Sequence, residues 1–242
     1  SYGSEGTISI NLDNTTFTSN GVFEVYAGEG KTAPITLTNG SVVTTAGALK
    51  LGNGASVVAD ATSSFTANGK SIFVATAGEN KYTSLAEAIA AANAGDTIKL
   101  LADVNESVTI NKNLTIDGAE KNYTGTMTIN NVTVTIENVV SNVNSSSAEN
   151  NAAFISNASG ATTIKLTNCV NNGAISSAKQ AGAFIGWSGT AFTAVFTGCV
   201  NNGTITATGS HVAGFIGCLE NTSAKFDVTF NACSNKGAIV GA

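Results

Sequence analysis

The sequence predicts an all-β fold in which short parallel strands stack in successive coils, a β-solenoid, with one short α-helix. Three observations predict it: a repeat of about thirty residues in the second half of the chain, alternation of apolar and polar residues within each repeat, and Asn and Gly at the same corner of each repeat. A coil of this size is too small to bury its inner face alone. We therefore expect each coil to stack on the next at about 4.8 Å, which places equivalent strands side by side in parallel sheets.

The composition restricts the class of protein. Of the 242 residues only 11% are charged, against about 25% in ordinary globular domains, while 43% are hydrophobic, which is too apolar for a disordered chain. The net charge is −5, and every base is a lysine. A nucleic-acid partner is not expected, because neutralising phosphates needs clustered cations. No apolar run approaches the roughly 18 residues that cross a bilayer, so we expect no membrane span in this chain.

Residues 1–80 form a β-rich region without a clear repeat. Short strand-like runs separated by turn residues suit either an irregular solenoid or a β-sandwich. The solenoid is favoured because Asn-Gly pairs, typical of the later corners, occur at residues 20–21, 39–40, 53–54 and 68–69. We place the boundary near residue 80, so that residues 81–242 form the second region.

The second region opens with a helix over residues 84–94. Ser84 and Glu87 form a capping box at its start, and Gly95 suits the C′ position at its end. Strand-like segments follow directly, from residue 96 to residue 118. An amphipathic helix at the end of a strand ladder covers apolar core and unpaired edges, so we expect this helix to cap the solenoid.

Three copies of the repeat can be aligned from residue 152 onward, and each copy is predicted to contain three short strands. Asn-Asn-Gly recurs at residues 171–173 and 201–203, and stacked corner amides can hydrogen-bond from one coil to the next. Aromatic and thiol side chains also recur at fixed positions of the repeat. We expect a structural ladder of stacked side chains made of Phe154, Phe184, Phe215, Cys169, Cys199 and Cys233.

The thiols and the one tryptophan are candidates for chemistry or binding. We expect Cys169, Cys199 and Cys233 to be buried free thiols, because parallel Cβ vectors disfavour a disulfide between stacked residues. Cys218 aligns with Trp187 rather than with the thiol ladder, and we expect it to be the more exposed thiol. Trp187 follows a glycine at a strand end. It either packs at a turn or offers a platform for a sugar ring, and it is the candidate ligand-binding residue.

A family resemblance adds to this interpretation. The run YTSLAEAIAAANAGDTIKLLADVNESVTINKNLTIDG, residues 82–118, looks like the opening of pectin-lyase-like right-handed parallel β-helices. The AGFIG and CVNNG stretches resemble repeats of large bacterial cell-surface proteins, where such strands are written as GLUG motifs. The resemblance covers roughly residues 82–242 and implies a right-handed parallel β-helix with a short capping α-helix. It implies little about activity, because this scaffold serves enzymes, adhesins, tailspikes and fibres.

No group of residues in the sequence suggests catalysis. Pectate-lyase-type elimination uses an arginine base in that family, and this chain has no arginine. The hydrolases of the family use grouped aspartates, whereas the six aspartates here are scattered. One histidine, His211, and four widely spaced cysteines do not form a zinc pattern. We expect no enzyme activity, no metal and no cofactor.

The sequence favours a noncatalytic structural protein that is extracellular and lies at the cell surface. We expect a subunit or segment of a surface fibre, built by coil stacking and by end-to-end self-association, since the coil at residues 238–242 looks uncapped. The alternative is a monomeric adhesin stalk that binds a carbohydrate or host-surface ligand. A polysaccharide-active enzyme is the third interpretation.

Overall fold

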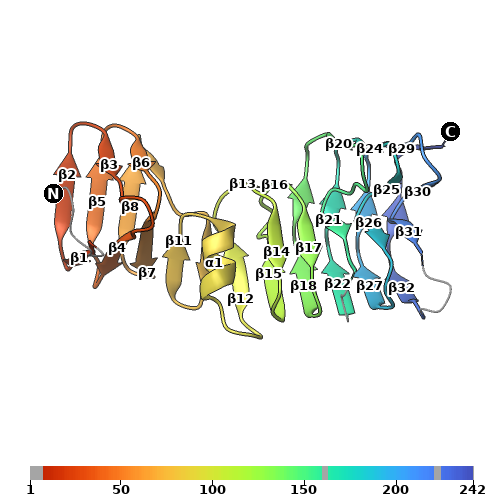
Figure 1. Ribbon diagram of the computed structural model, residues 1–242, viewed down its shortest axis with the longest axis horizontal. Coiled ribbons are helices and arrows are strands. Elements are labelled where there is room, and N and C mark those ends of the chain that lie inside the picture. The colour runs from red at the N-terminus through yellow and green to blue at the C-terminus, as the bar shows by residue number, and fades with distance from the viewer. Residues whose placement is uncertain (1–7, 160–162, 221–224, 242) are drawn as a thin grey trace. The chain divides into compact units, whose positions relative to one another are not determined.

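The computed structural model describes residues 8–159, 163–220 and 225–241, and it divides into two compact units, Ser1–Ala88 and Ile89–Ala242. Strands make up nearly all of the regular structure of the described residues, most strands pair in parallel, and one short helix accompanies them (Figure 1). The predicted all-β class with one short helix is confirmed. Ala242, the last residue of the coil expected to be uncapped, lies outside the described residues.

The first unit consists of three parallel stacks of strands. Hydrogen bonds between successive turns join residues 26 and then 22 positions apart. Apolar side chains at alternate positions, such as Ile35, Leu37 and Val57, fill its core. Three antiparallel strands follow the stacks: β9 (Lys70–Ser71) pairs with β8, β11 (Asn80–Tyr82) pairs with β7, and β10 (Ala75–Ala77) pairs with β11. The stacks are β1 (Ile10–Asp13), β4 (Ala33–Thr38) and β7 (Ala55–Asp60); β2 (Thr16–Ser19), β5 (Val42–Thr45) and β8 (Ser64–Ala67); and β3 (Phe23–Val25) with β6 (Leu49–Leu51).

The helix α1 (Leu85–Ala91) is shorter than predicted at its C-terminal end. Its start is as expected, since the Ser84 hydroxyl accepts a hydrogen bond from the Glu87 amide at 3.0 Å. At its end, the Lys112 ammonium donates to the carbonyl oxygens of Ala90 and Ala92. The Asp96 carboxylate accepts from the amide of Asn93 and holds a turn there. These two sets of bonds satisfy groups that a longer helix would have used.

The second unit is organised around one long parallel sheet. We call the residues from one strand of this sheet to the next a pass. The Asn113–Thr133 hydrogen bond between successive passes spans 20 residues, and the Asn171–Asn201 bond spans 30. The parallel pairing in the later passes therefore follows the sequence repeat. The strands, in order, are β12 (Thr97–Leu100), β15 (Leu114–Asp117), β18 (Thr133–Glu137), β22 (Thr163–Thr167), β27 (Thr193–Thr197) and β32 (Asp227–Asn231).

We call a pass of about 20 residues narrow and a pass of 30 or more residues wide. Two further parallel stacks run beside this sheet through both kinds of pass. One stack is continuous, although its register shifts between Met127 and Thr128. The other is divided, and an isolated bridge between Asn122 and Val140 connects its two parts. The continuous stack is β14 (Val108–Ile110), β17 (Met127–Ile129), β21 (Ile155–Asn157), β26 (Ile185–Ser188) and β31 (Ile216–Leu219). The divided stack is β13 (Val104–Asn105) and β16 (Tyr123–Thr124), then β19 (Val140–Ser141), β23 (Val170–Asn171), β28 (Val200–Asn201) and β33 (Ser234–Asn235).

The wide passes contain additional strands. The sequence predicted three strands per repeat, whereas five strands, β22 to β26, precede the return to β27. The prediction was wrong because it treated the Asn-Asn-Gly corner as a turn alone, whereas the first Asn of each corner belongs to a short strand that pairs in parallel with the next pass. The additional strands are β20 (Ser145–Ser147), β24 (Ile175–Ser177), β29 (Ile205–Ala207) and β34 (Ile239–Gly241), together with β25 (Gln180–Gly182) and β30 (His211–Ala213).

The core of the second unit consists of columns of stacked side chains. In the long sheet, Ile116, Ile136, Leu166, Phe196 and Phe230 are in register from strand to strand. The first four are fully buried, and Phe230 on the outermost described strand is 51% exposed. Each pass therefore covers the core of the pass before it, which is the expected energetic role of stacking.

Candidate functional site

The predicted aromatic residues form a column next to the continuous stack. The Phe184 ring is stacked between those of Phe154 and Phe215, with centroid separations of 5.5 and 4.9 Å. Phe154 and Phe184 are fully buried. The strands that directly follow them place Ile155 opposite Ile185, and Ile185 opposite Ile216, so the column follows the register of the backbone. Phe154 and Phe184 therefore pack in the core and offer no surface to a ligand, while Phe215 is half-buried.

The predicted thiols occupy equivalent positions in three successive passes. The carbonyl of Cys169 accepts from the Val200 amide, and that of Cys199 accepts from the Ser234 amide, both at 3.0 Å. All three are free; Cys169 and Cys199 are buried and Cys233 is half-buried. A hydrogen bond with Cys199 and burial raise the pKa of the Cys169 thiol. The Cys169 thiol is therefore neutral and packed, and it is not a nucleophile.

The expectation that Cys218 is the exposed thiol is wrong. Cys218 is in register with Trp187, as the alignment indicates, but it is only 7% exposed. Cys233 is the more exposed thiol because it lies on the last described pass. Trp187 is half-buried, and its indole N–H donates to the Glu220 carboxylate at 3.0 Å. One edge of this ring is thus held in place, while part of it faces solvent.

An amide ladder runs through the interior at the Asn-Gly corner. Asn171 donates to Asn201 at 2.7 Å, and Asn201 donates to Asn235 at 2.6 Å. Each of the three also donates to the carbonyl of the glycine two residues later, at 2.9 Å. Asn171 and Asn201 are fully buried. The sequence predicted stacked corner amides, and the structure shows that one row of them lies inside the protein.

A second amide ladder lies outside, directly beside the first. Asn202 donates to Asn172, and Asn172 donates to Asn142, each at 2.7 Å. These side chains are exposed. The inner ladder begins at Asn171, one pass later in the chain than the outer ladder, because Ser141 stands in register with Asn171. The Oδ1 atom of Asn171 is buried there without a donor.

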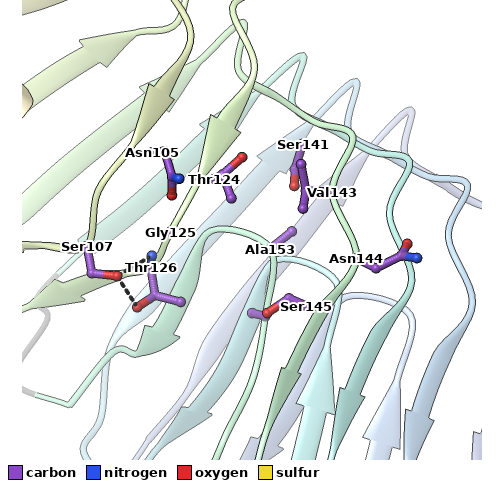
Figure 2. A pocket seen from close by; sticks show the side chains of 11 residues that line it. Asn105, Ser107, Thr124, Gly125, Thr126, Ser141, Val143, Asn144, Ser145 and Ala153 are labelled. Atoms are coloured by element: carbon purple, nitrogen blue, oxygen red, sulfur yellow. Dashed lines mark hydrogen bonds between the residues drawn. The ribbon is translucent and has the colours of Figure 1, made fainter.

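A hollow of about 250 Å³ opens where the narrow passes give way to the wide ones. We call it the notch. Figure 2 shows residues of the narrow passes along one side and residues of the first wide pass along the other, and Ser107 receives hydrogen bonds from Thr126 on the narrow side. No charged side chain is among the residues that line it, so it suits an uncharged polar ligand. The notch is lined by Asn105, Ser107, Thr124, Gly125, Thr126, Ser141, Val143, Asn144, Ser145, Ala152 and Ala153.

Five of the aspartates considered as candidate acids and bases accept hydrogen bonds from amide groups. Asp60 accepts from the amides of Asn39, Thr62 and Ser63, and hydrogen bonds from Ser63 and Thr62 hold the pKa of its carboxyl well below the usual range. Backbone amides likewise bind the carboxylates of Asp96, Asp103 and Asp117, and the side-chain amide of Asn39 binds that of Asp13. Within the described ranges, no group of three or more His, Cys, Asp or Glu residues could hold a metal ion.

The described helix is neither long nor apolar enough to span a membrane. Comparisons with protein-family profiles, with curated protein sequences and with solved structures each find no match. The geometry of the ladders and of the notch is therefore the basis for a functional proposal.

Proposed function

We propose that this chain is a noncatalytic structural segment of an extracellular cell-surface fibre. In this proposal the passes are coils of a right-handed parallel β-helix of the pectin-lyase-like type, with repeats of the GLUG kind. The parallel register from pass to pass supports this winding, and crossovers between parallel strands are right-handed in nearly all proteins.

The observation that carries the proposal is the stacking of like side chains along the molecule. The inner amides, the outer amides and the phenylalanines each contact the same residue type in the next pass. In such ladders the polar groups bond to neighbours of the same kind and are not directed toward a substrate. The aspartates that bind turns are used in the same way. This is the arrangement expected of a protein whose role is to be stable along its length.

End-to-end contact is proposed through the strands at the far end of the second unit. On β32 and β34, Phe230, Ile239 and Val240 are 51%, 40% and 47% exposed. These strands pair on one side only within the described residues. A strand edge with apolar side chains is a template for another strand. We propose that a second copy of the chain covers it.

The proposal is tested by sedimentation velocity and negative-stain electron microscopy of the 242-residue protein over a range of concentrations. We expect linear end-to-end oligomers, and we expect Phe230→Asp to abolish them because a charge then lies on the contact edge. Leu101→Asp is the control, since Leu101 is an exposed apolar residue of a turn in the same unit. Monodisperse monomers at every concentration would contradict the fibre proposal.

The second candidate function is a monomeric adhesin stalk. It is favoured by one observation, the half-exposed ring of Trp187 fixed by Glu220, since such a ring can stack on a sugar. A glycan array provides the test. Binding that Trp187→Ala removes would support this function, and an array without hits would contradict it.

A further inference from the structure

The change in the width of the passes leaves one strand edge open inside the second unit. Between β16 and β17 the chain needs only Gly125 and Thr126, whereas residues 142–154 separate β19 from β21 and include β20. The pass before β20 therefore has no strand at the equivalent place. β20 pairs with β24 on one side and is the outermost strand of its four-stranded sheet.

The direction of the open backbone groups follows from the ladder geometry. The Ser145 amide donates to the carbonyl of Ala174, and the carbonyl of Ser147 accepts from the Ala178 amide. In a parallel ladder, alternate residues direct both backbone groups to the same neighbour. Ser146, between them, therefore directs its N–H and its C=O away from β24, and its side chain is exposed.

The side chains of β20 differ from those of β24 and β29, the strands that follow it in the same sheet. The first position is Ile175 in β24 and Ile205 in β29, both buried, but it is Ser145 in β20. All three residues of β20 are serine. The edge is thus built for polar surroundings, and an apolar partner strand would not match it. Ser145 also lines the notch, whose other polar residues are Asn, Ser and Thr.

We propose that the open edge of β20, with the notch beside it, binds an extended polypeptide segment that has small, uncharged, polar side chains. The segment adds to β20 as a further parallel strand, in the place that the narrow passes leave empty. Ser146 donates its N–H to a carbonyl of the segment and accepts from an amide of the segment at its own C=O. The neutral lining of the notch selects against charged segments.

The probe for this site is the acetylated peptide Asn-Val-Asn-Ser-Ser-Ser-Ala, the sequence of residues 142–148. A parallel strand with the sequence of β20 itself has the small, uncharged, polar side chains that the proposal requires. Hydrogen exchange at the Ser146 amide is followed by NMR in the full chain. We expect saturable slowing of this exchange, by about tenfold or more at high peptide concentration, because the amide becomes hydrogen-bonded.

Matched variants separate backbone pairing from other contacts. Ser146→Pro removes the N–H that points away from β24 without touching a bond to β24, and proline is tolerated at such an edge position. Ser146→Ala keeps the N–H. We expect peptide-induced shifts of notch amides such as Gly125 to be lost in the first variant and kept in the second. In case Ser146→Pro fails to fold, the unaltered protein is tested with two methylated peptides. N-methylation of the sixth residue should abolish binding, and N-methylation of the fifth, which faces away from β20, should not.

Three results would overturn the proposal. The first is the absence of saturable exchange slowing by the peptide. The second is equal binding of the two N-methylated peptides. The third is that another ligand binds the same amides. Either maltose slows their exchange in place of the peptide, or the chain without peptide forms a dimer that Ser146→Pro dissociates. These tests do not depend on end-to-end assembly, so they fail or succeed independently of the fibre proposal.

Discussion

Replacing Asn201 by alanine tests whether the buried amide ladder holds the passes together. Asn201 makes four hydrogen bonds: it donates to the carbonyl of Gly203 and to Asn235, and it accepts from Asn171 and from the Gly203 amide. The alanine variant leaves both backbone groups of the buried Gly203 and one side-chain N–H of the buried Asn171 without these partners. The exposed Asn235 can turn to water instead.

The expected loss follows from these three buried groups. Each buried polar group left unpaired costs about 1 to 3 kcal/mol, so Asn201→Ala should lower the free energy of unfolding by about 3 to 9 kcal/mol. Asn202→Ala is the matched control, because the adjacent Asn202 makes a bond of the same length to Asn172 but is exposed. Its loss should be below about 1 kcal/mol, since water replaces the partner.

The measurement is a urea titration followed by the fluorescence of Trp187, the one tryptophan of the chain. With a slope of about 2 to 3 kcal/mol per M, a loss near 4 kcal/mol lowers the midpoint by about 1.5 M. Circular dichroism under native conditions confirms that both variants fold. If the two variants have equal midpoints, burial of the inner ladder does not matter and the reasoning is refuted.

Three other substitutions or reactions probe the remaining features. Phe184→Ala should cost about 3 to 5 kcal/mol in the same titration, because its ring is stacked between two others, and a loss below about 1 kcal/mol would contradict that packing. Cys233 should be labelled by iodoacetamide in the native protein while Cys169 reacts only in urea, as peptide mass spectrometry can show; early labelling of Cys169 would contradict its burial. Lys112→Met should speed amide exchange in the last turn of α1, since its ammonium no longer binds the final carbonyls; unchanged exchange would show that those bonds do not hold the helix end.

The sequence predicts the register of the wide passes well, for a physical reason. The repeat of Asn-Asn-Gly fixes where each corner lies, and side chains alternate along a strand, so the spacing alone pairs Val170 with Val200. The capping box likewise predicts the start of the helix, because Ser84 and Glu87 interact locally. Features that depend on neighbours in sequence, or on one repeated distance, are accessible without coordinates.

The notch and the true thiol exposures were not accessible in this way. The notch arises because a wide pass contains a strand, β20, that the narrow pass before it lacks. The narrow passes contain no residue pattern that indicates this missing strand. Ser141 looks like any polar corner residue until the register places it opposite Asn171. The burial of Cys218 depends on its surroundings in three dimensions, which alignment with Trp187 does not report. One signal was present in the sequence: the Ser-Ser-Ser run at 145–147 interrupts a position that is isoleucine in the later repeats.

The buried amides explain why stacking is specific as well as stable. Strands of alternating small residues can slip along one another, since many registers bury a similar apolar area. An interior asparagine removes this freedom, because a shift by one residue would leave its amide buried without a partner. The spacing of the ladder supports this account: Asn171 and Asn201 are 30 residues apart, whereas Asn201 and Asn235 are 34 apart, yet both pairs bond. The longer pass accommodates its additional residues elsewhere and keeps the amide contact. The corner therefore sets the register, and the length of the remaining chain is adjusted to it.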